Sequence, residues 1–304
     1  MTMFGVSDMG EDIGFCFAAL RVRLLDLIAT VIDVFTPPHD PGRGHPRSAT
    51  VRVLATLRQF LREGTPWRSL KATTDKVSGS TLRRHLEQWA NIGLLAQVHA
   101  VLVGMLRGDP TLILDTCSVR AKRGGDLTDP IDRGKRGTKY HIATMGDGVP
   151  VACAATAANV NDTLVFERLF LTAFAVMARI QAVFADKGYD AEHHRDLCRK
   201  FGAEPCIHKR GQPHGSGLGK RRWPVERSNA LENKRLALRY DRLGFIIQSL
   251  LHASFWLRGA WQRNCKSGFK LLNSKKPFWC HLKNLAGVLA ITSFIEEDWR
   301  ALLR

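Results

Sequence analysis

Two apolar runs that each end in an aspartate place the strongest constraint on how this chain can fold. The run TLILD ends at Asp115, and the run AVFAD ends at Asp186. Short apolar runs bounded by polar residues are typical of buried strands. Because a helical pattern lies between them, a right-handed crossover can lay the second strand parallel to the first. Both aspartates are then expected at one edge of one sheet, where ligands tend to bind.

A third acidic residue, Glu226, follows the basic segment KRRWP. Pro224 is well tolerated in the first turn of a helix, so we expect a helix that begins near Trp223 and carries Glu226 close to its start. The apolar residues expected to anchor this helix are Leu231, Leu236 and Leu238.

Each of these acids also has a simpler explanation. Asp115 could merely end a strand, Asp186 could begin a turn, and Glu226 could be a first-turn acid that favours the helix dipole. Their joint placement, at two strand ends and one helix start, instead favours a site. Carboxylate oxygens suit Mg²⁺ or Mn²⁺, and two such ions held by carboxylates are typical of phosphoryl transfer.

Charge supports a polyanionic partner. Lysine and arginine number 45 against 28 aspartates and glutamates, a formal net charge of +17, which favours nucleic acid. A basic solvated surface, or binding to anionic lipid, is the alternative. The seven cysteines are scattered without a CxxC pair, which argues against zinc. The apolar stretch 15–35 is interrupted by charges and the N-terminus lacks a basic signal region, so we expect a cytoplasmic, nucleoid-associated protein with no membrane partner.

The first hundred residues predict helices. Apolar residues recur at helical spacing over 15–35 and 49–62, with shorter helices predicted over 67–71 and 78–91 and another from 99 to 106. The helices predicted over 49–62, 67–71 and 78–91 together resemble a helix-turn-helix, in which Arg83 and Arg84 would face DNA. An ordinary helical bundle with solvated arginines is the alternative.

The middle of the chain predicts an α/β fold. Strands are expected over 111–119, 138–145, 149–156, 181–185 and 204–208, with helices over 161–177 and 191–201. Together they predict a mixed five-stranded sheet flanked by helices. The predicted domains are 1–107, helical and DNA-binding; 108–262, catalytic; and 263–304, a basic C-terminal tail.

Four segments then resemble, in order, the motifs of a known family: LDTCSVRA, ANVND, FADKGYDA and RRWPVERSNALENKRL. They are similar to those of bacterial insertion-sequence transposases with a DDE triad on an RNase H-like fold, especially the group named after insertion sequence five. GTPWRSL and STLRRHLEQW are similar to that group's N-terminal region. The resemblance spans about 42–260.

This resemblance implies a catalytic and metal-binding triad of Asp115, Asp186 and Glu226 with two Mg²⁺ or Mn²⁺ ions. It also implies binding of double-stranded DNA at terminal inverted repeats, cleavage, and joining of 3′ ends to target DNA by a homo-oligomer. Gly219 and Asn233 depart from the family's tyrosine and lysine positions. The predicted DNA contacts are Arg83, Arg84, Lys122, Arg123, Lys220, Arg221, Arg222, Lys234 and Arg235. A non-catalytic DNA-binding protein, a nuclease that does not join ends, and an inactive remnant stay open as alternatives.

Overall fold

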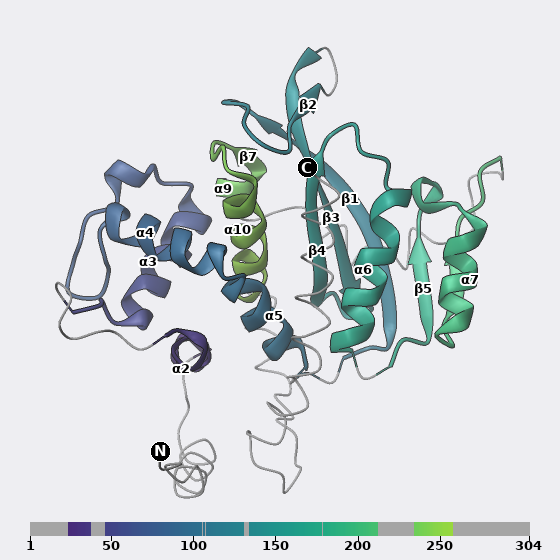
Figure 1. Cartoon of the computed structure of the whole chain (residues 1–304), viewed down its shortest axis with the longest axis horizontal. Helices are drawn as coiled ribbons and strands as arrows, with labels where there is room; N and C mark the ends of the chain where they lie inside the picture. The colour runs from purple at the N-terminus through teal and green to yellow at the C-terminus, as the bar shows by residue number, and fades with distance from the viewer. Residues whose placement is uncertain are drawn as a thin grey trace, which may run out of the picture.

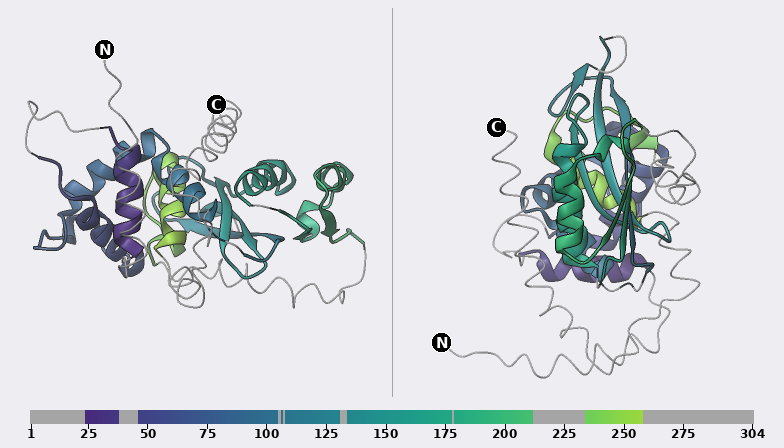
Figure 2. Two further views of the ribbon diagram at one scale, coloured as in Figure 1. Left: turned by 90° about the horizontal axis from the view of Figure 1, so that it is seen from below. Right: turned by 90° about the vertical axis from the view of Figure 1, so that its right-hand side faces the viewer.

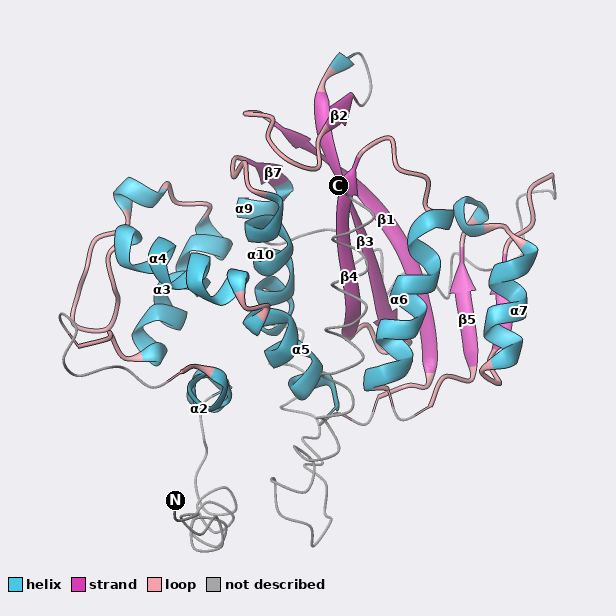
Figure 3. Ribbon diagram, in the orientation of Figure 1, coloured by secondary structure: helices cyan, strands magenta, loops and turns pink. Residues whose placement is uncertain are grey.

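The computed structural model describes residues 24–37, 46–104, 106, 108–130, 134–177, 179–211 and 234–257. Helices from the N-terminal part lie beside an α/β part built on one mixed sheet (Figures 1 and 3). Three groups of predictions lie outside the described residues: Glu226 with its helix start, the basic residues Lys220, Arg221 and Arg222, and the tail 263–304.

The N-terminal helices predicted from the sequence are present, and the first of them, predicted over 15–35, lies within the described residues only from Leu24 onward. They are α2 (Leu24–Phe35), α3 (Thr50–Glu63), the 3-10 helix η1 (Trp67–Ser69), α4 (Gly79–Asn91) and α5 (Leu94–Gly104). Gly64 ends α3 in a left-handed conformation with φ 69°, and Ser78 caps α4 by accepting a hydrogen bond from the Thr81 N–H. The helix predicted from 99 begins earlier, at Leu94, because Gly93 at φ 65° turns the chain directly from α4 into α5.

The apolar stripes predicted on these helices form their core. The α3 side chains at the predicted positions are fully buried: Val53, Leu54, Leu57, Phe60 and Leu61. On α4, Leu82, Leu86 and Trp89 are buried while Arg83 and Arg84 are exposed. The sequence pattern therefore assigned the inner and outer faces of both helices correctly.

The sheet has the predicted mixed topology. Strands β1 (Thr111–Ala121), β3 (Arg136–Met145) and β4 (Pro150–Ala157) are antiparallel, and β5 (Ala182–Ala185) and β6 (Glu204–Ile207) add in parallel beside β1. The central order is β4-β3-β1-β5-β6. A tight hairpin at 146–148 joins β3 to β4, with Gly148 at φ 88°.

The predicted strand count was wrong, because the sheet has seven strands. Strands β1 and β3 extend two residues beyond their predicted ends, and the two-residue strands β2 (Asp129–Pro130) and β7 (Leu238–Arg239) pair with these extensions. Leu238 was expected in a helix, but α9 (Lys234–Ala237) ends before it. Arg239 accounts for the change: its buried guanidinium donates to the Thr138 hydroxyl and to carbonyls of Leu127, Asp241 and Arg242.

Helix α10 (Gly244–Trp256) joins the two parts of the molecule. It packs against α5 and α4 on one side and β4 on the other, and Figure 2 shows it, in light green, between the N-terminal helices and the sheet. One face of the sheet is covered by α6 (Thr163–Val176), which packs against β3 and β4, with η3 (Lys187–Tyr189) and α7 (Glu192–Lys200) beyond β5. Among the described helices, none has the length and apolarity to cross a membrane.

Candidate active site and basic groove

Asp115 and Asp186 belong to adjacent parallel strands, as the crossover argument predicted. Strand β1 pairs with β5 up to Ile113 opposite Phe184, and each aspartate lies two residues further along its chain. Side chains two residues apart on an extended chain point to the same side. Continuing the register therefore places Asp115 across from Asp186. Asp115 is 9% exposed, which is low for a carboxylate.

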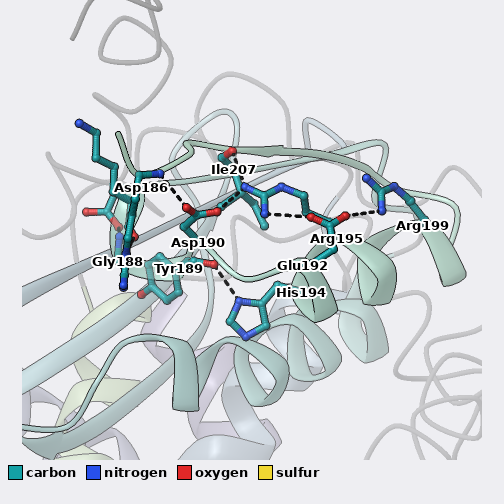
Figure 4. Close-up of polar contacts among 11 residues, drawn as sticks. Asp186, Gly188, Tyr189, Asp190, Glu192, His194, Arg195, Arg199 and Ile207 are labelled. Carbon is teal, nitrogen blue, oxygen red and sulfur yellow. Dashed lines mark hydrogen bonds and ion pairs between the residues drawn. The ribbon is translucent and has the colours of Figure 1, made fainter. Parts of the chain in front are cut away.

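The backbone just after β5 holds Asp186. Its side-chain Oδ1 accepts a hydrogen bond from the Gly188 N–H at 2.8 Å and so caps the short helix η3. Figure 4 shows Asp186 and Gly188 beside each other at one end of a longer polar network. The turn predicted at Asp186 is thus present, and its role as a functional acid stays a prediction.

That network fixes the loop behind Asp186. The Asp190 carboxylate pairs with the Arg195 guanidinium at 2.6 Å and accepts the Arg210 N–H at 2.7 Å, while Arg195 also donates to the Ile207 carbonyl (Figure 4). The Arg210 backbone and the Arg195 side chain hold the pKa of Asp190 below its usual value. The loop is thereby tied to α7 and to the end of β6. No role was predicted for Asp190 or Arg195 from the sequence, although Asp190 lies inside the motif FADKGYDA.

A second polar cluster, which we call the Asp162 cluster, lies where α6 begins. Asp162 pairs with Lys139 at 2.9 Å and accepts from the Thr116 hydroxyl at 3.4 Å, and His141 Nδ1 lies 3.8 Å from its Oδ1. Burial is the main cause that lowers the pKa of His141 to about 4, so its ring is neutral at pH 7. Asp162 carries the end of the ANVND segment, to which no role was assigned from the sequence.

A basic groove of about 1030 Å³ lies between the N-terminal helices and the segment around β7. Five arginines line it, from η1, α4, the segment after β1, α9 and the segment before α10: Arg68, Arg83, Arg123, Arg235 and Arg242. Glu87, Asp126 and Asp241 also line it, so the positive charge is partly offset. Arg68 and Arg242 were not predicted from the sequence, because nothing in their local pattern places them beside Arg83.

The other predicted DNA contacts differ in exposure. Arg84, Lys122 and Lys234 are exposed. Arg235, in contrast, is only 6% exposed; it pairs with Asp241 at 2.7 Å and lies over the Phe60 ring at 4.4 Å. Its charge is already neutralised by protein groups, so its contacts stabilise the junction of α3 and α9.

The described acids have the donor chemistry that a hard divalent cation needs. Asp115 and Asp186 offer carboxylate oxygens, which Mg²⁺ prefers. Within the described ranges, no group of three or more His, Cys, Asp or Glu side chains converges to hold a metal. Glu226, the third predicted ligand, lies outside these ranges.

Both predicted aspartates fall within a segment that is similar to a known domain. Residues 106–251 match the transposase DDE domain family. A Burkholderia cepacia protein named "Putative transposase for insertion sequence element IS402" is 42% identical over 123 residues, which are 38% of this chain and 58% of that protein. The chain thus spans just over half of this relative.

Solved structures with related shapes include two transposase complexes. The piggyBac transposase synaptic complex with hairpin DNA aligns with 90% of this chain and 78% of that one, at 9% identity and a TM-score of 0.41. The pre-cleavage Mos1 transpososome aligns with 85% of this chain and 96% of that one, at 13% identity and a TM-score of 0.30.

Proposed function

We propose that this chain is a DDE transposase of an insertion sequence. In this proposal it binds the element's terminal inverted repeats, cleaves the DNA ends and joins the 3′ ends to target DNA. The observation that carries the proposal is that Asp115, within β1, and Asp186, directly after β5, take neighbouring positions on two parallel strands of the matched domain. A relationship to the insertion-sequence-five group, and an RNase H-like fold, are part of the proposal; the strand order and the crossover before β5 support the fold.

The proposed catalytic residues are Asp115, Asp186 and Glu226, which would hold two Mg²⁺ or Mn²⁺ ions. When bound, such ions lower the pKa of a coordinated hydroxyl and neutralise charge on the transferred phosphoryl group. The chain's own part is to hold its carboxylates in place. Burial of Asp115 in β1 and the Gly188 hydrogen bond to Asp186 restrict both side chains before any substrate arrives.

The proposed DNA surface combines the basic groove with exposed side chains of α4. Arg83, Arg84 and Arg123 are exposed, and Arg83 and Arg123 line the groove from opposite parts of the molecule. We propose that α4 acts as the recognition helix of a helix-turn-helix and that phosphates occupy the groove. Joining two element ends implies a homo-oligomer on DNA. This proposal implies that the protein is located in the cytoplasm and associates with the nucleoid.

The test uses labelled DNA that carries the inverted repeats flanking the coding region. Asp115→Asn, Asp186→Asn and Glu226→Gln should each reduce Mg²⁺-dependent strand cleavage by at least about 10³-fold, because each removes a charge from the metal-binding set. Binding of the end DNA in a gel-shift assay should change little. Glu192→Gln, which removes an exposed charge from α7, is the matched control and should cleave as the wild type does.

The products separate the competing functions. Joined product formed by the wild type supports a transposase, whereas cleavage without joining would identify a nuclease. Binding of end DNA without cleavage on addition of Mg²⁺ would indicate a DNA-binding protein or an inactive remnant. Full cleavage by any one of the three substituted proteins would refute the assigned triad.

A further inference from the structure

Asp162 and Asp186 approach each other across Gly188. A methyl group placed on the Gly188 Cα would lie 2.7 Å from Oδ2 of Asp162 and 2.9 Å from Oδ1 of Asp186. The two oxygens therefore flank one point, and their separation cannot exceed the sum of these distances. The backbone of Gly188 is outside the left-handed region, so the absence of a side chain is what permits this approach.

The two sides of the Asp162 carboxylate have different partners. Oδ1 accepts from Lys139 Nζ at 2.9 Å, and the same ammonium donates to the Val160 carbonyl at 2.8 Å, which fixes its position. Oδ2 faces the Asp186 side, and its one hydrogen bond within the described ranges is the long 3.4 Å contact with the Thr116 hydroxyl. Lys139 thus pairs with Oδ1 of Asp162, and Oδ2 stays directed toward the Asp186 carboxylate.

The buried ring of His141 adds an independent observation. Its side chain is fully buried, and its Nδ1, 3.8 Å from Asp162 Oδ1, has no hydrogen-bond partner among the residues that the structure describes. Buried polar atoms without a hydrogen-bond partner are uncommon in folded proteins. Across the described residues, Asp186 accepts from Gly188 and pairs with no lysine or arginine, so the converging carboxylates repel each other.

We propose that Asp162 is a fourth acidic residue of the metal-binding set, acting beside Asp186 to bind a divalent cation. This inference rests on the proposed function, because it extends the same site. Carboxylate oxygens that converge in a restricted space favour Mg²⁺ or Mn²⁺ over softer metals. Lys139 holds the Asp162 carboxylate in the orientation that directs Oδ2 toward Asp186.

The experiment measures Mn²⁺ binding by the full chain, without DNA, through the loss of the free Mn²⁺ signal in electron paramagnetic resonance. Asp162→Asn should weaken Mn²⁺ binding by about tenfold or more. Gly188→Ala should also weaken binding, although it removes no charge, because its methyl group forces the two carboxylates apart. Glu192→Gln removes an exposed carboxylate from the neighbouring helix and should bind Mn²⁺ like the wild type.

Asp186→Asn separates the two ways of failing. If it weakens Mn²⁺ binding while Asp162→Asn and Gly188→Ala bind like the wild type, the role of Asp162 is wrong and the proposed transposase site stands. If none of the three changes alters Mn²⁺ binding, both the fourth residue and the proposed metal site are wrong. Gly188→Ala decides the matter if Asp162→Asn fails to fold, as judged by circular dichroism.

Discussion

Two buried polar clusters of this molecule keep their groups hydrogen-bonded by different means. Behind Asp186, the cluster around Arg195 pairs full charges: its guanidinium is 7% exposed and the Asp190 side chain is 17% exposed. Between α5, β4 and α10, the cluster around His99 and His252 contains no charged group. The first cluster joins a loop to the sheet, and the second joins the helical part to the sheet.

The histidine cluster is a directed chain of hydrogen bonds. His99 Nε2 faces the Pro150 carbonyl at 3.0 Å, so this nitrogen carries the proton and His99 Nδ1 accepts from His252 Nδ1 at 3.1 Å. Gln248 then donates to His252 Nε2 at 3.0 Å and accepts from the Ala155 N–H. An added proton would set two N–H groups against each other. Burial also lowers the pKa of both rings, that of His99 to about 4.

The comparison teaches that two similarly buried clusters lose their stabilising effect in different ranges of pH as the solution is acidified. A paired carboxylate with a lowered pKa stabilises the fold above its ordinary value near 4 and loses this effect only in stronger acid. A buried neutral histidine stabilises the fold above its ordinary value of 6.5 and loses this effect as pH falls below it.

The largest effect should come from breaking the charged cluster. Arg195→Met leaves Asp190 without its cation and the Ile207 carbonyl without a donor, so the free energy of unfolding should fall by about 3 kcal/mol. Urea denaturation at pH 7 measures it. Arg199→Met, on the exposed side of α7, is the control. Equal stabilities of the two variants would show that the Asp190 pair contributes little.

A smaller effect should come from acid acting on the histidine cluster. Between pH 7 and pH 5.5, His99 and His252 bind protons in the unfolded chain but stay neutral in the folded one. The free energy of unfolding should therefore fall by about 1 kcal/mol for each ring. Urea denaturation at both pH values measures the loss. His99→Gln should reduce this pH dependence, whereas Arg195→Met should keep that of the wild type. An unchanged dependence in His99→Gln would contradict the assigned neutral state.

The smallest effect should come from the rim of the charged cluster. Glu192 contacts Arg195 at 3.4 Å and Arg199 at 3.0 Å, but its side chain is 62% exposed. Solvent screens such pairs, so Glu192→Gln should leave the urea midpoint unchanged within experimental error. A clear destabilisation would mean that Arg195 depends on Glu192 as well as on Asp190 for its orientation.

Most of the fold was predictable because local patterns and long-range packing agree. A few neighbouring residues determine each local structure: the apolar stripe of α3, the Ser78 cap of α4 and the glycine hairpin at 146–148. Strands β2 and β7 were not predictable in this way. Each has two residues, and Arg239 of β7 donates to Leu127 and Thr138, which are more than one hundred residues earlier in the chain.

The candidate site was predictable only in part for the same reason. Asp115 and Asp186 each follow a recognisable apolar run, and the parallel pairing of β1 with β5 brings them to adjacent positions. The nearness of Asp162 to Asp186 depends on the missing side chain of Gly188 and on the position of Lys139, and sequence patterns encode neither contact. Likewise, the groove arginines come from segments far apart in the chain.

Helix α10 has a mechanical consequence. Because it is wedged against α4 and α5 as well as β4, force on α4 passes through packed side chains into the sheet. Each contact in this series, from α4 to α10 and from α10 to β4, is between packed elements of the described chain. A force applied to the arginines of α4 should therefore displace the edge of the sheet, and the two parts should move together as one rigid unit.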